Sequence, residues 1–163
     1  MALTIDLSDK IAIVTGGGRG IGREIALALA DAGADVAVAA RTLSQVEETR
    51  RLIMAKGRRS LAFPVDVTQK YQVEAMVEEP IDRLGGVHIL FNNAGITRPA
   101  PLLEYSETDW DMVMAINVKG MFLCTQAVGR HLVKQRYGKI INIGSTGGEM
   151  AGPKNAVYHA SKG

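Results

Sequence analysis

Three residues that can move protons or stabilise developing charge stand near the end of the sequence: Ser145, Tyr158 and Lys162. Tyr158 and Lys162 are four residues apart, and a four-residue step along a helix returns to the same face. The phenol and the ammonium would therefore point into one site, where the cation favours the ionised phenol. This pair is typical of proton transfer to or from an oxygen, as in carbonyl reduction or alcohol oxidation.

A glycine-rich turn near the start of the chain offers a place for a phosphate-bearing group. It runs from Thr15 to Gly22 and includes Gly16 and Gly20. Glycines let the backbone approach a pyrophosphate, and the following helix N-terminus offers unpaired N–H groups. No window matches G-x-G-x-x-G, and Arg23 stands where the phosphate loop of nucleotide hydrolases has its lysine. We interpret the turn as a dinucleotide site; a tight strand-to-helix turn without a ligand is the alternative.

Short apolar runs alternate with longer helical patterns along the chain. The apolar runs predict strands at Ile11–Thr15, Val36–Ala40, Leu61–Val65, His88–Phe91 and Lys139–Ile143. The longer patterns predict helices at Arg23–Ala32, Leu43–Lys56, Lys70–Leu84 and Glu107–Gln135. This alternation predicts an α/β fold, a doubly wound, Rossmann-like parallel sheet with helices on both faces. In the strand order 3-2-1-4-5 the fifth strand would lie at an edge.

Local signals refine these elements. Gly33 and Gly57 follow helices at the position where a C-cap glycine belongs. Pro80 falls inside a helical segment, where we expect it to kink or break the helix. One basic run lies at a helix end and in the loop after it, where we expect a solvated surface. It comprises Arg50, Arg51, Lys56, Arg58 and Arg59.

Composition and charge exclude several classes of protein. The hydrophobic share of 47% excludes a disordered chain. A net charge of +2 is too small to indicate a nucleic-acid partner. Cys124 is the single cysteine, which favours a reducing compartment. Residues 1–10 lack the apolar core of a signal peptide, and we expect no membrane span of ~18 apolar residues. The sequence predicts a soluble, cytoplasmic protein.

The motifs together resemble the short-chain dehydrogenase/reductase family, in their order and their spacing. They are the glycine turn, Asn92-Asn93-Ala94-Gly95, Asn117, Ser145 and Tyr158-x-x-x-Lys162, with Asp66-Val67 after the third strand. The nearest subgroup looks like the 3-oxoacyl-carrier-protein reductases and related sugar or polyol dehydrogenases. The resemblance covers the whole chain, and the set of Asn117, Ser145, Tyr158 and Lys162 is its most specific part.

The family continues past the lysine with the rest of its helix, two more strands and a substrate-binding loop. The resemblance therefore implies that residues 1–163 are a dinucleotide-binding domain, incomplete at its C-terminus and truncated after the fifth strand. The edge strand would leave Ile140, Ile141 and Ile143 without partners. The helix bearing Tyr158 would have little more than one turn. Members commonly oligomerise through the long helix and the catalytic helix, so a homo-oligomer is implied for the full-length form.

The resemblance also assigns roles to the catalytic residues. Tyr158 would be the general acid in reduction and the base in oxidation. Lys162 would assist its ionisation and hold the nicotinamide ribose, and Ser145 would donate a hydrogen bond to the substrate oxygen. Asn117 would hold a water that relays protons to Lys162. The alternative for Asn117 is a side chain that bends its helix by bonding to its own backbone.

Cofactor choice depends on the end of the second strand, where an acidic residue would bind a ribose 2′-hydroxyl and arginine a 2′-phosphate. This chain has Arg41 there, while Asp35 lies at the wrong end of the strand. Arg19 could make a second contact with the same phosphate. We therefore expect NADP(H) over NAD(H), although Arg41 could instead cap exposed backbone. The cofactor-binding residues implied are Gly16, Arg19, Gly20, Ile21, Gly22, Arg41, Asp66, Val67, Asn93, Tyr158 and Lys162.

The substrate is less defined than the cofactor. Residues 147–157 would form part of the mouth of the site, with a partly apolar lining at Met150 and Ala151. In the carrier-protein reductases a basic patch like Lys134, Arg136 and Lys139 would meet an acidic carrier. Cations at a helix C-terminus are the simpler interpretation.

Two classes of function remain open. One is a ketone reductase acting on a small-molecule carbonyl or alcohol. The other is a nucleotide-binding or interaction protein without catalysis. His88, beside the fourth strand, has no neighbours in the sequence that suggest a metal site, and we expect it to be structural.

Overall fold

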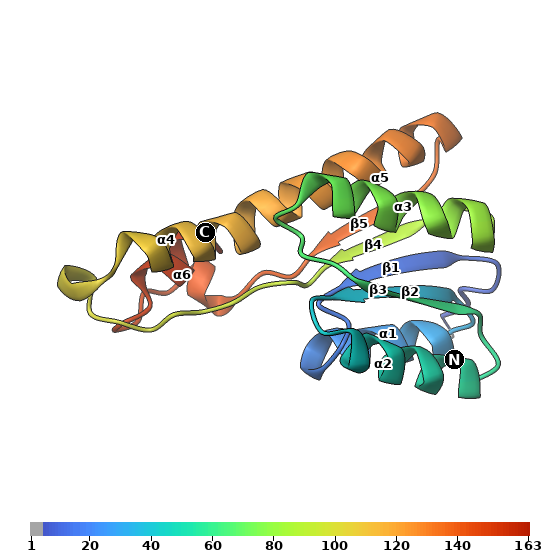
Figure 1. Cartoon of the computed structure of the whole chain (residues 1–163), viewed down its shortest axis with the longest axis horizontal. Helices are drawn as coiled ribbons and strands as arrows, with labels where there is room; N and C mark the ends of the chain where they lie inside the picture. The colour runs from blue at the N-terminus through green and yellow to red at the C-terminus, as the bar shows by residue number, and fades with distance from the viewer. Residues whose placement is uncertain (1–4) are drawn as a thin grey trace.

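The computed structural model describes residues 5–163, which form a parallel five-stranded sheet with helices on both faces (Figure 1). The strand order is β3-β2-β1-β4-β5, as expected, and β5 lies at an edge. The strands are β1 (Ile11–Thr15), β2 (Asp35–Ala40), β3 (Ser60–Pro64), β4 (Ile89–Asn92) and β5 (Lys139–Asn142). Four of the five predicted strands differ from these bounds, each by one residue at one or both ends.

The helices divide between the two faces of the sheet (Figure 1). The α-helices are α1 (Gly20–Asp31), α2 (Leu43–Ala55), α3 (Lys70–Leu84), α4 (Glu107–Met114), α5 (Met121–Gln135) and α6 (Ala156–Ala160). Shorter elements are η1 (Leu102–Glu104), η2 (Ala115–Gly120) and η3 (Thr146–Gly148). Helices α1 and α2 cover one face, and α3 and α5 cover the other.

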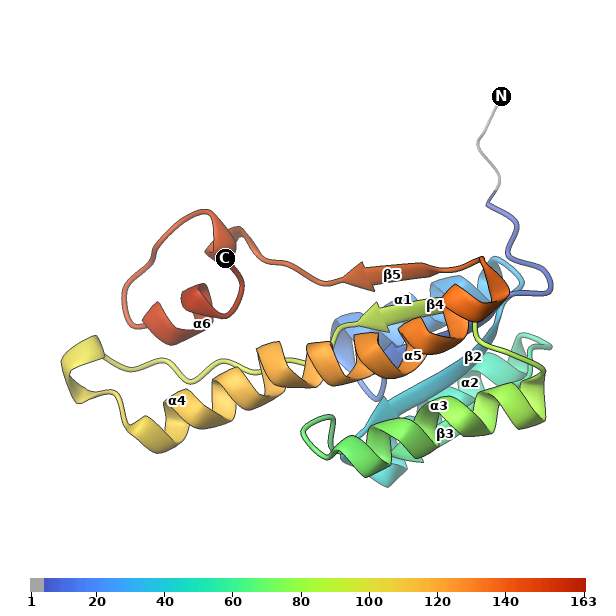
Figure 2. The same cartoon turned by 90° about the horizontal axis from the view of Figure 1, so that it is seen from above.

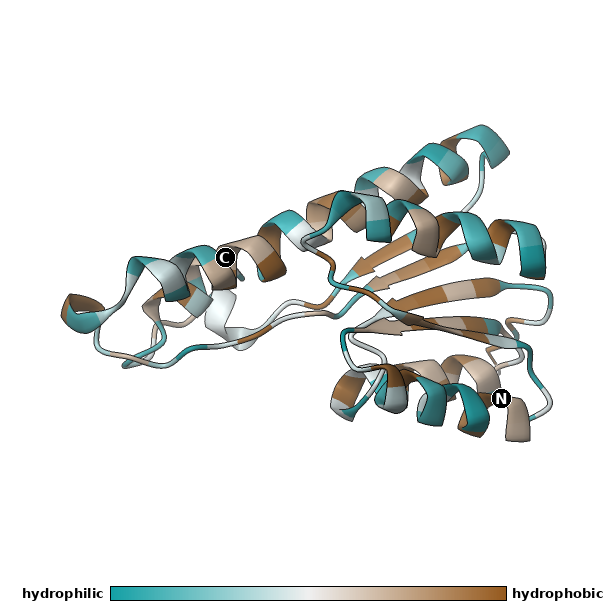
Figure 3. Cartoon of the chain, viewed as in Figure 1, coloured by the Kyte–Doolittle hydropathy of each residue, from teal (hydrophilic) through white to brown (hydrophobic). Residues whose placement is uncertain are grey.

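Alternation along the strands builds a separate core on each face. In β1, Ala12 and Val14 belong to the core under α1 and α2, whereas Ile13 belongs to the core under α3 and α5. Both sets are buried, so β1 is apolar from Ile11 to Val14, and the strands appear brown along most of their length in Figure 3. This double burial explains why the apolar runs in the sequence were nearly continuous.

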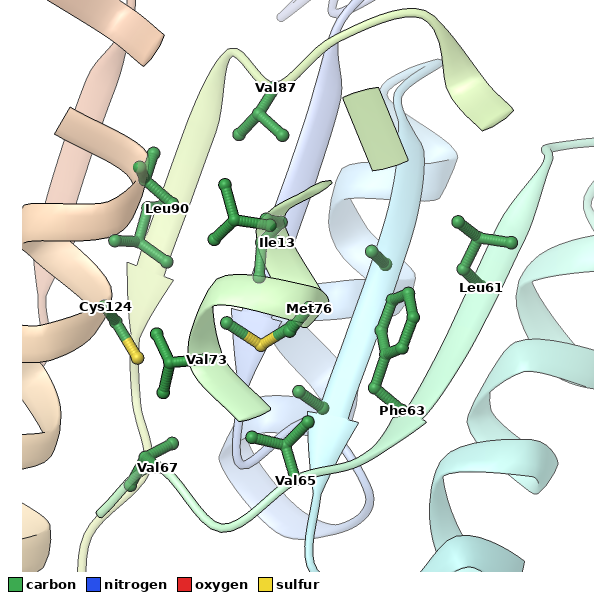
Figure 4. Packing of buried hydrophobic residues seen from close by; sticks show 14 of the residues in the cluster. Ile13, Leu61, Phe63, Val65, Val67, Val73, Met76, Val87, Leu90 and Cys124 are labelled. Carbon is green, nitrogen blue, oxygen red and sulfur yellow. The ribbon is translucent and has the colours of Figure 1, made fainter. Parts of the chain in front are cut away.

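The core under α3 and α5 is densely filled (Figure 4). Val73 and Met76 of α3 and Cys124 of α5 pack over Ile13 and Leu90 of the sheet. Burial raises the pKa of the Cys124 thiol to about 12, because the thiolate would lose its hydration. Cys124 is therefore an inert core residue.

The predicted helix Glu107–Gln135 is continuous, and its middle turn, η2, is π-helical. Its first segment, α4, extends beyond the sheet and lies beside α6, as both views show (Figures 1 and 2). By length and composition alone this helix is apolar enough to cross a membrane, which corrects our expectation that no such stretch exists. In this fold Val128 and Leu132 of α5 are buried in the core beneath α3 and α5.

Other expectations need correction. Pro80 does not break α3, which runs on to Leu84 with Pro80 buried, although we expected a break or kink. Arg58 and Arg59 are not merely solvated, because both form ion pairs of 2.9 and 2.7 Å with the buried Asp35. A buried carboxylate requires such partners. The left-handed Gly33 and Gly57, by contrast, confirm the predicted C-cap glycines, although α1 and α2 each end one residue earlier than predicted.

Candidate active site

A cleft of about 720 Å³ lies along the carboxyl ends of all five strands. Ligands bind at this edge in doubly wound sheets, where the loops after the strands converge. Every predicted site residue except Asn117 lines the cleft. Those residues are Gly16, Arg19, Gly20, Ile21, Gly22, Arg41, Asp66, Val67, Asn93, Ser145, Tyr158 and Lys162.

The glycine turn leaves no room for side chains at its closest approach. A Cβ on Gly22 would collide with the carbonyl oxygen of Gly16 and with the amide of Asn93. Gly16 itself has a φ of +67°, in the left-handed region that favours glycine. The Asn93 amide also donates to the carbonyl oxygens of Thr15 and Gly16, at 3.0 and 3.3 Å. These contacts hold the turn against the end of β4 and leave a cradle in front of α1.

Arg23 fixes the other side of the same turn, a role that sequence reasoning missed. Its guanidinium donates to the Gly18 carbonyl at 2.7 Å and to the Thr49 hydroxyl at 3.1 Å. Thr49 is fully buried in α2. An arginine directly after the last glycine was the signal in the sequence, but its partner on α2 lies 26 residues away. Arg23 thus ties the turn to the second helix.

The end of β2 carries a positive charge at the cleft. Arg41 and Arg19 are both exposed and both line it, together with Thr42 and Gln45. No ion pair to a carboxylate is found for either arginine within residues 5–163. The two guanidiniums are therefore available to an anionic group in the cleft.

The turn after β3 is shaped by Asp66. Its carboxylate accepts from the Thr68 main-chain N–H and hydroxyl at 3.0 and 2.8 Å, and its own N–H donates to Gln72. These bonds present Asp66 and Val67 at the cleft.

Ser145, at the start of η3, and Tyr158 and Lys162, in and just after α6, line the same cleft, and η3 and α6 contact each other. The Ser145 Oγ accepts from the Gly147 N–H at 3.0 Å, so the hydroxyl hydrogen remains free to donate into the cleft. The Lys162 ammonium donates to the Ile143 carbonyl at 2.6 Å. Tyr158 is half-buried in α6, whereas Lys162 lies in the turn just after that helix, which ends at Ala160.

Asn117 lies outside the lining of the cleft, in the π-helical turn. Its amide oxygen accepts from the Ile96 N–H at 2.9 Å, and its nitrogen donates to the Ile96 carbonyl at 3.0 Å and to the Ser161 hydroxyl at 2.9 Å. The side chain is thus occupied by the loop after β4 and by the residue beside Lys162. It is not bonded to its own helix, so that alternative is wrong.

Sequence analysis also missed several residues of the cleft. Most are small or apolar, and their types carry no chemical signal. They are Ala40, Thr42, Gln45, Val65, Ile96, Thr97, Ile116, Ile143 and Gly144, whereas Gly18, Ala94 and Gly95, which also line the cleft, belong to the glycine turn and the Asn92–Gly95 motif. Within residues 5–163 no group of three or more His, Cys, Asp or Glu side chains is arranged to hold a metal ion.

Comparison with known proteins agrees with this geometry. The 3-oxoacyl-acyl-carrier-protein reductase FabG of Staphylococcus epidermidis is 43% identical over 155 residues, which are 94% of this chain and 64% of the reductase. A gluconate 5-dehydrogenase from Burkholderia cenocepacia, solved with NADP and tartrate, superimposes with a TM-score of 0.91 at 39% identity, covering 98% of this chain and 62% of its own. An NAD⁺-bound xylitol dehydrogenase gives 0.92 at 34% identity, covering 95% and 60%.

This chain therefore spans less than two thirds of the length of these relatives. Its residues 10–163 match the family described as short chain dehydrogenase, which is nearly the whole chain. The match includes the glycine turn, the loop after β4 and the Tyr158–Lys162 pair. The protein belongs to the short-chain dehydrogenase family.

Proposed function

We propose that the protein is an NADP(H)-dependent oxidoreductase that interconverts a ketone and a secondary alcohol by hydride transfer. The observation that carries this proposal is that Ser145, Tyr158 and Lys162 line the same cleft as the glycine turn. A binding protein without catalysis has no need of a phenol and an ammonium beside a serine hydroxyl. Residues 1–163 would be the dinucleotide-binding domain of this enzyme.

The residues of the cleft fit a dinucleotide. Gly20, the first residue of α1, has only open space where a Cβ would stand, which allows a pyrophosphate to approach the backbone at the N-terminus of the helix. Asn93 is held so that it supports the turn rather than filling the cleft. Asp66 and Val67 would contact the adenine, and Lys162 the ribose beside the nicotinamide.

The two arginines support NADP(H) as the preferred cofactor. Arg41 and Arg19 are unpaired cations at the place where the adenosine ribose would lie, and a 2′-phosphate would satisfy both. Relatives differ in this respect, since the gluconate 5-dehydrogenase was solved with NADP and the xylitol dehydrogenase with NAD⁺. NAD(H) would gain no such contact here.

The chemistry follows from the hydrogen bonds already present. A nicotinamide whose ribose is held by Lys162 would supply the hydride for reduction of the carbonyl carbon and would take it up in oxidation. Ser145, whose oxygen accepts from Gly147, donates its own hydrogen to the substrate oxygen and stabilises the developing negative charge. Tyr158 then gives its phenolic proton to that oxygen, completing the alcohol. Lys162, held by Ile143, keeps a positive charge beside the phenol and favours the phenolate that results.

Asn117 would position other residues rather than hold the relay water with its own amide. Because the amide is bonded to Ile96 and Ser161, it braces the loop after β4 against the turn that carries Lys162. The water that relays protons to Lys162 would then be held by the surrounding main chain, where the π-helical turn alters the regular backbone bonding.

We further propose that the enzyme is soluble in the cytoplasm and assembles as a homo-oligomer. Phe122 and Val133 on α5 are exposed, by 55% and 77%, and an interface along this helix would cover them. Burial of these side chains in an interface between subunits would also account for the apolar character of the helix Glu107–Gln135 without a membrane. The basic residues Lys134, Arg136 and Lys139 span the last turn of α5, its C-cap and the start of β5, and we interpret them as cations at the helix C-terminus and the turn after it rather than as a carrier site.

The proposal is tested by steady-state kinetics on the full-length protein with a simple β-ketoester. We expect oxidation of NADPH that depends on the ketone, with a kcat/KM for NADPH clearly above that for NADH. Equal kcat/KM values for the two coenzymes would overturn the cofactor preference. Tight binding of NADPH with no turnover of any ketone or alcohol would favour a binding protein and contradict the proposed reaction.

A further inference from the structure

One side chain beside the predicted catalytic tyrosine is bound to the facing loop at two points. The imidazole Nδ1 of His159 lies 2.7 Å from the Gly147 carbonyl oxygen, and its Nε2 accepts from the Gly152 N–H at 3.0 Å. Because Nε2 accepts, the proton of the neutral ring lies on Nδ1 and is donated to Gly147. His159 therefore spans the segment from Gly147 to Gly152 with two complementary hydrogen bonds.

The residue that receives the first bond also contacts Ser145. The Gly147 N–H donates to the Ser145 Oγ at 3.0 Å, while the Gly147 carbonyl accepts from His159. Two consecutive peptide groups thus join the Ser145 hydroxyl to the imidazole of His159. Since His159 follows Tyr158 directly in the sequence, this short path connects the serine hydroxyl to the helix that carries the phenol.

The main chain reinforces the same contact. The His159 carbonyl accepts from the N–H groups of Lys162 and Gly163, both at 3.0 Å. A Cβ on Gly148 would collide with the Lys162 carbonyl, so the loop backbone lies directly against the lysine turn. A Cβ on Gly147 would lie 2.6 Å from the His159 Nδ1. The approach of imidazole and loop therefore requires a glycine at position 147.

From this geometry we propose that His159 is a positioning residue, which fastens the segment Ser145–Gly152 to the turn of Tyr158 and Lys162 and so sets the Ser145 hydroxyl relative to the phenol. The inference rests on the proposed function. Because the Ser145 Oγ accepts the bond from the Gly147 N–H, the serine hydroxyl hydrogen stays free to donate into the cleft.

The first test compares His159→Ala with the wild type in the full-length protein. We expect kcat/KM for the ketone to fall by about 10- to 100-fold, because small displacements of reacting groups are that costly. The dissociation constant for NADPH, from fluorescence titration, should change little, since the glycine turn, Arg41 and Asp66 lie on other elements. His131→Ala, a histidine of α5 outside the cleft, is the matched control and should retain wild-type kinetics.

Conservative variants identify which bond matters. In His159→Asn the amide nitrogen lies near the position of Nδ1 and can still donate to Gly147, whereas His159→Gln offers an acceptor near Nε2 for Gly152. We expect the asparagine variant to recover more kcat than the glutamine variant, because the Gly147 bond adjoins Ser145. Recovery by glutamine alone would overturn the link to Ser145.

A double-mutant cycle tests the contact itself. Gly147→Ala should lower kcat in the wild type, because the new methyl displaces the imidazole. In the His159→Ala background the same substitution should have little further effect, since the side chain it displaces is gone. Additive losses would contradict the proposal. Unchanged kinetics of His159→Ala in an active enzyme would also overturn it, whereas an inactive wild type would instead refute the proposed function.

Discussion

The Lys162 ammonium donates a 2.6 Å hydrogen bond to the carbonyl of Ile143, the residue that directly follows β5. The lysine is therefore held by the end of the edge strand as well as by the short turn after α6. An ammonium has three donors, so two remain for the cleft. Because Ser145 lies two residues beyond Ile143, the same strand end positions both the cation and the serine hydroxyl.

Replacing Lys162 should therefore disturb both the charge and the geometry of the site. For Lys162→Met we expect kcat/KM to fall by about 10²-fold or more, the range for loss of acid–base assistance. Lys162→Arg should recover little, because a planar guanidinium cannot reproduce both the bond to Ile143 and the contacts in the cleft. Steady-state kinetics measure this effect, with the melting temperature as the control for folding. Full activity of Lys162→Met would refute the role assigned to the ammonium.

Gly22→Ala should destabilise the protein and prevent dinucleotide binding. The methyl would collide with the Gly16 carbonyl and the Asn93 amide, and overpacking of this kind costs about 1–3 kcal/mol in the free energy of unfolding. Gly129→Ala is a matched control, since Gly129 lies inside α5 with nothing within 4 Å of its added Cβ. This second change should stabilise the protein by about 0.5–1 kcal/mol. Urea denaturation measures the free energy of unfolding of both variants. Equal changes of the same sign would contradict the close packing of Gly22 against Gly16 and Asn93.

Arg41→Asp should invert the coenzyme preference. Loss of a charge-assisted hydrogen bond to the 2′-phosphate costs about 1.5–3 kcal/mol, so kcat/KM for NADPH should fall about 10- to 100-fold. The new carboxylate can accept a bond from a ribose 2′-hydroxyl, so NADH should bind better. Arg51→Asp makes the same change of charge on α2 outside the cleft and should leave the preference intact. A coenzyme ratio unchanged by Arg41→Asp would show that Arg41 only caps backbone.

Stability should decline as the pH falls below 6.5, because of His88. Desolvation lowers the pKa of His88 below 6.5, with further lowering by the charges of Lys10 and His131. The neutral imidazole accepts from the Ile11 N–H at 3.0 Å through Nδ1, and protonation would remove this acceptor. The unfolded chain thus binds the proton first, so stability present above pH 6.5 is lost as pH falls through the folded pKa.

Urea midpoints measured on either side of pH 6.5 test this effect. His88→Asn keeps an acceptor near Nδ1 and does not titrate in this range, so its midpoint should vary less with pH. The same slope in both proteins would assign the acid sensitivity to other groups.

Strong periodic patterns predicted most of the fold, whereas contacts between distant residues were beyond the sequence. The bounds of β1, α3 and the helix Glu107–Gln135 were confirmed because the apolar pattern of each is clear in its own sequence. Pro80 was misjudged because its burial in the core depends on tertiary packing. The pairing of Asp35 with Arg58 and Arg59 joins residues more than twenty positions apart, and local charge patterns cannot show it.

For the candidate site, too, the sequence indicated the residues with distinctive chemistry but not the contacts between distant residues. Motif spacing found residues whose chemistry is distinctive, such as Ser145 and Tyr158, and the cleft brings them together. It could not find the partners of Asn117, because Ile96 lies 21 residues away. It also passed over His159, whose role depends on the approach of two glycines rather than on a motif.

The most direct test of the account is the comparison of Tyr158→Phe with the wild type in the full-length protein. NADPH binding, followed by fluorescence titration, should be retained, because the phenyl ring keeps its place in α6 and the glycine turn is unchanged. Reduction of a β-ketoester should fall by about 10²- to 10⁴-fold, since the proton donor is gone. Wild-type rates of ketone reduction by Tyr158→Phe would contradict the central claim that this phenol is the general acid and base.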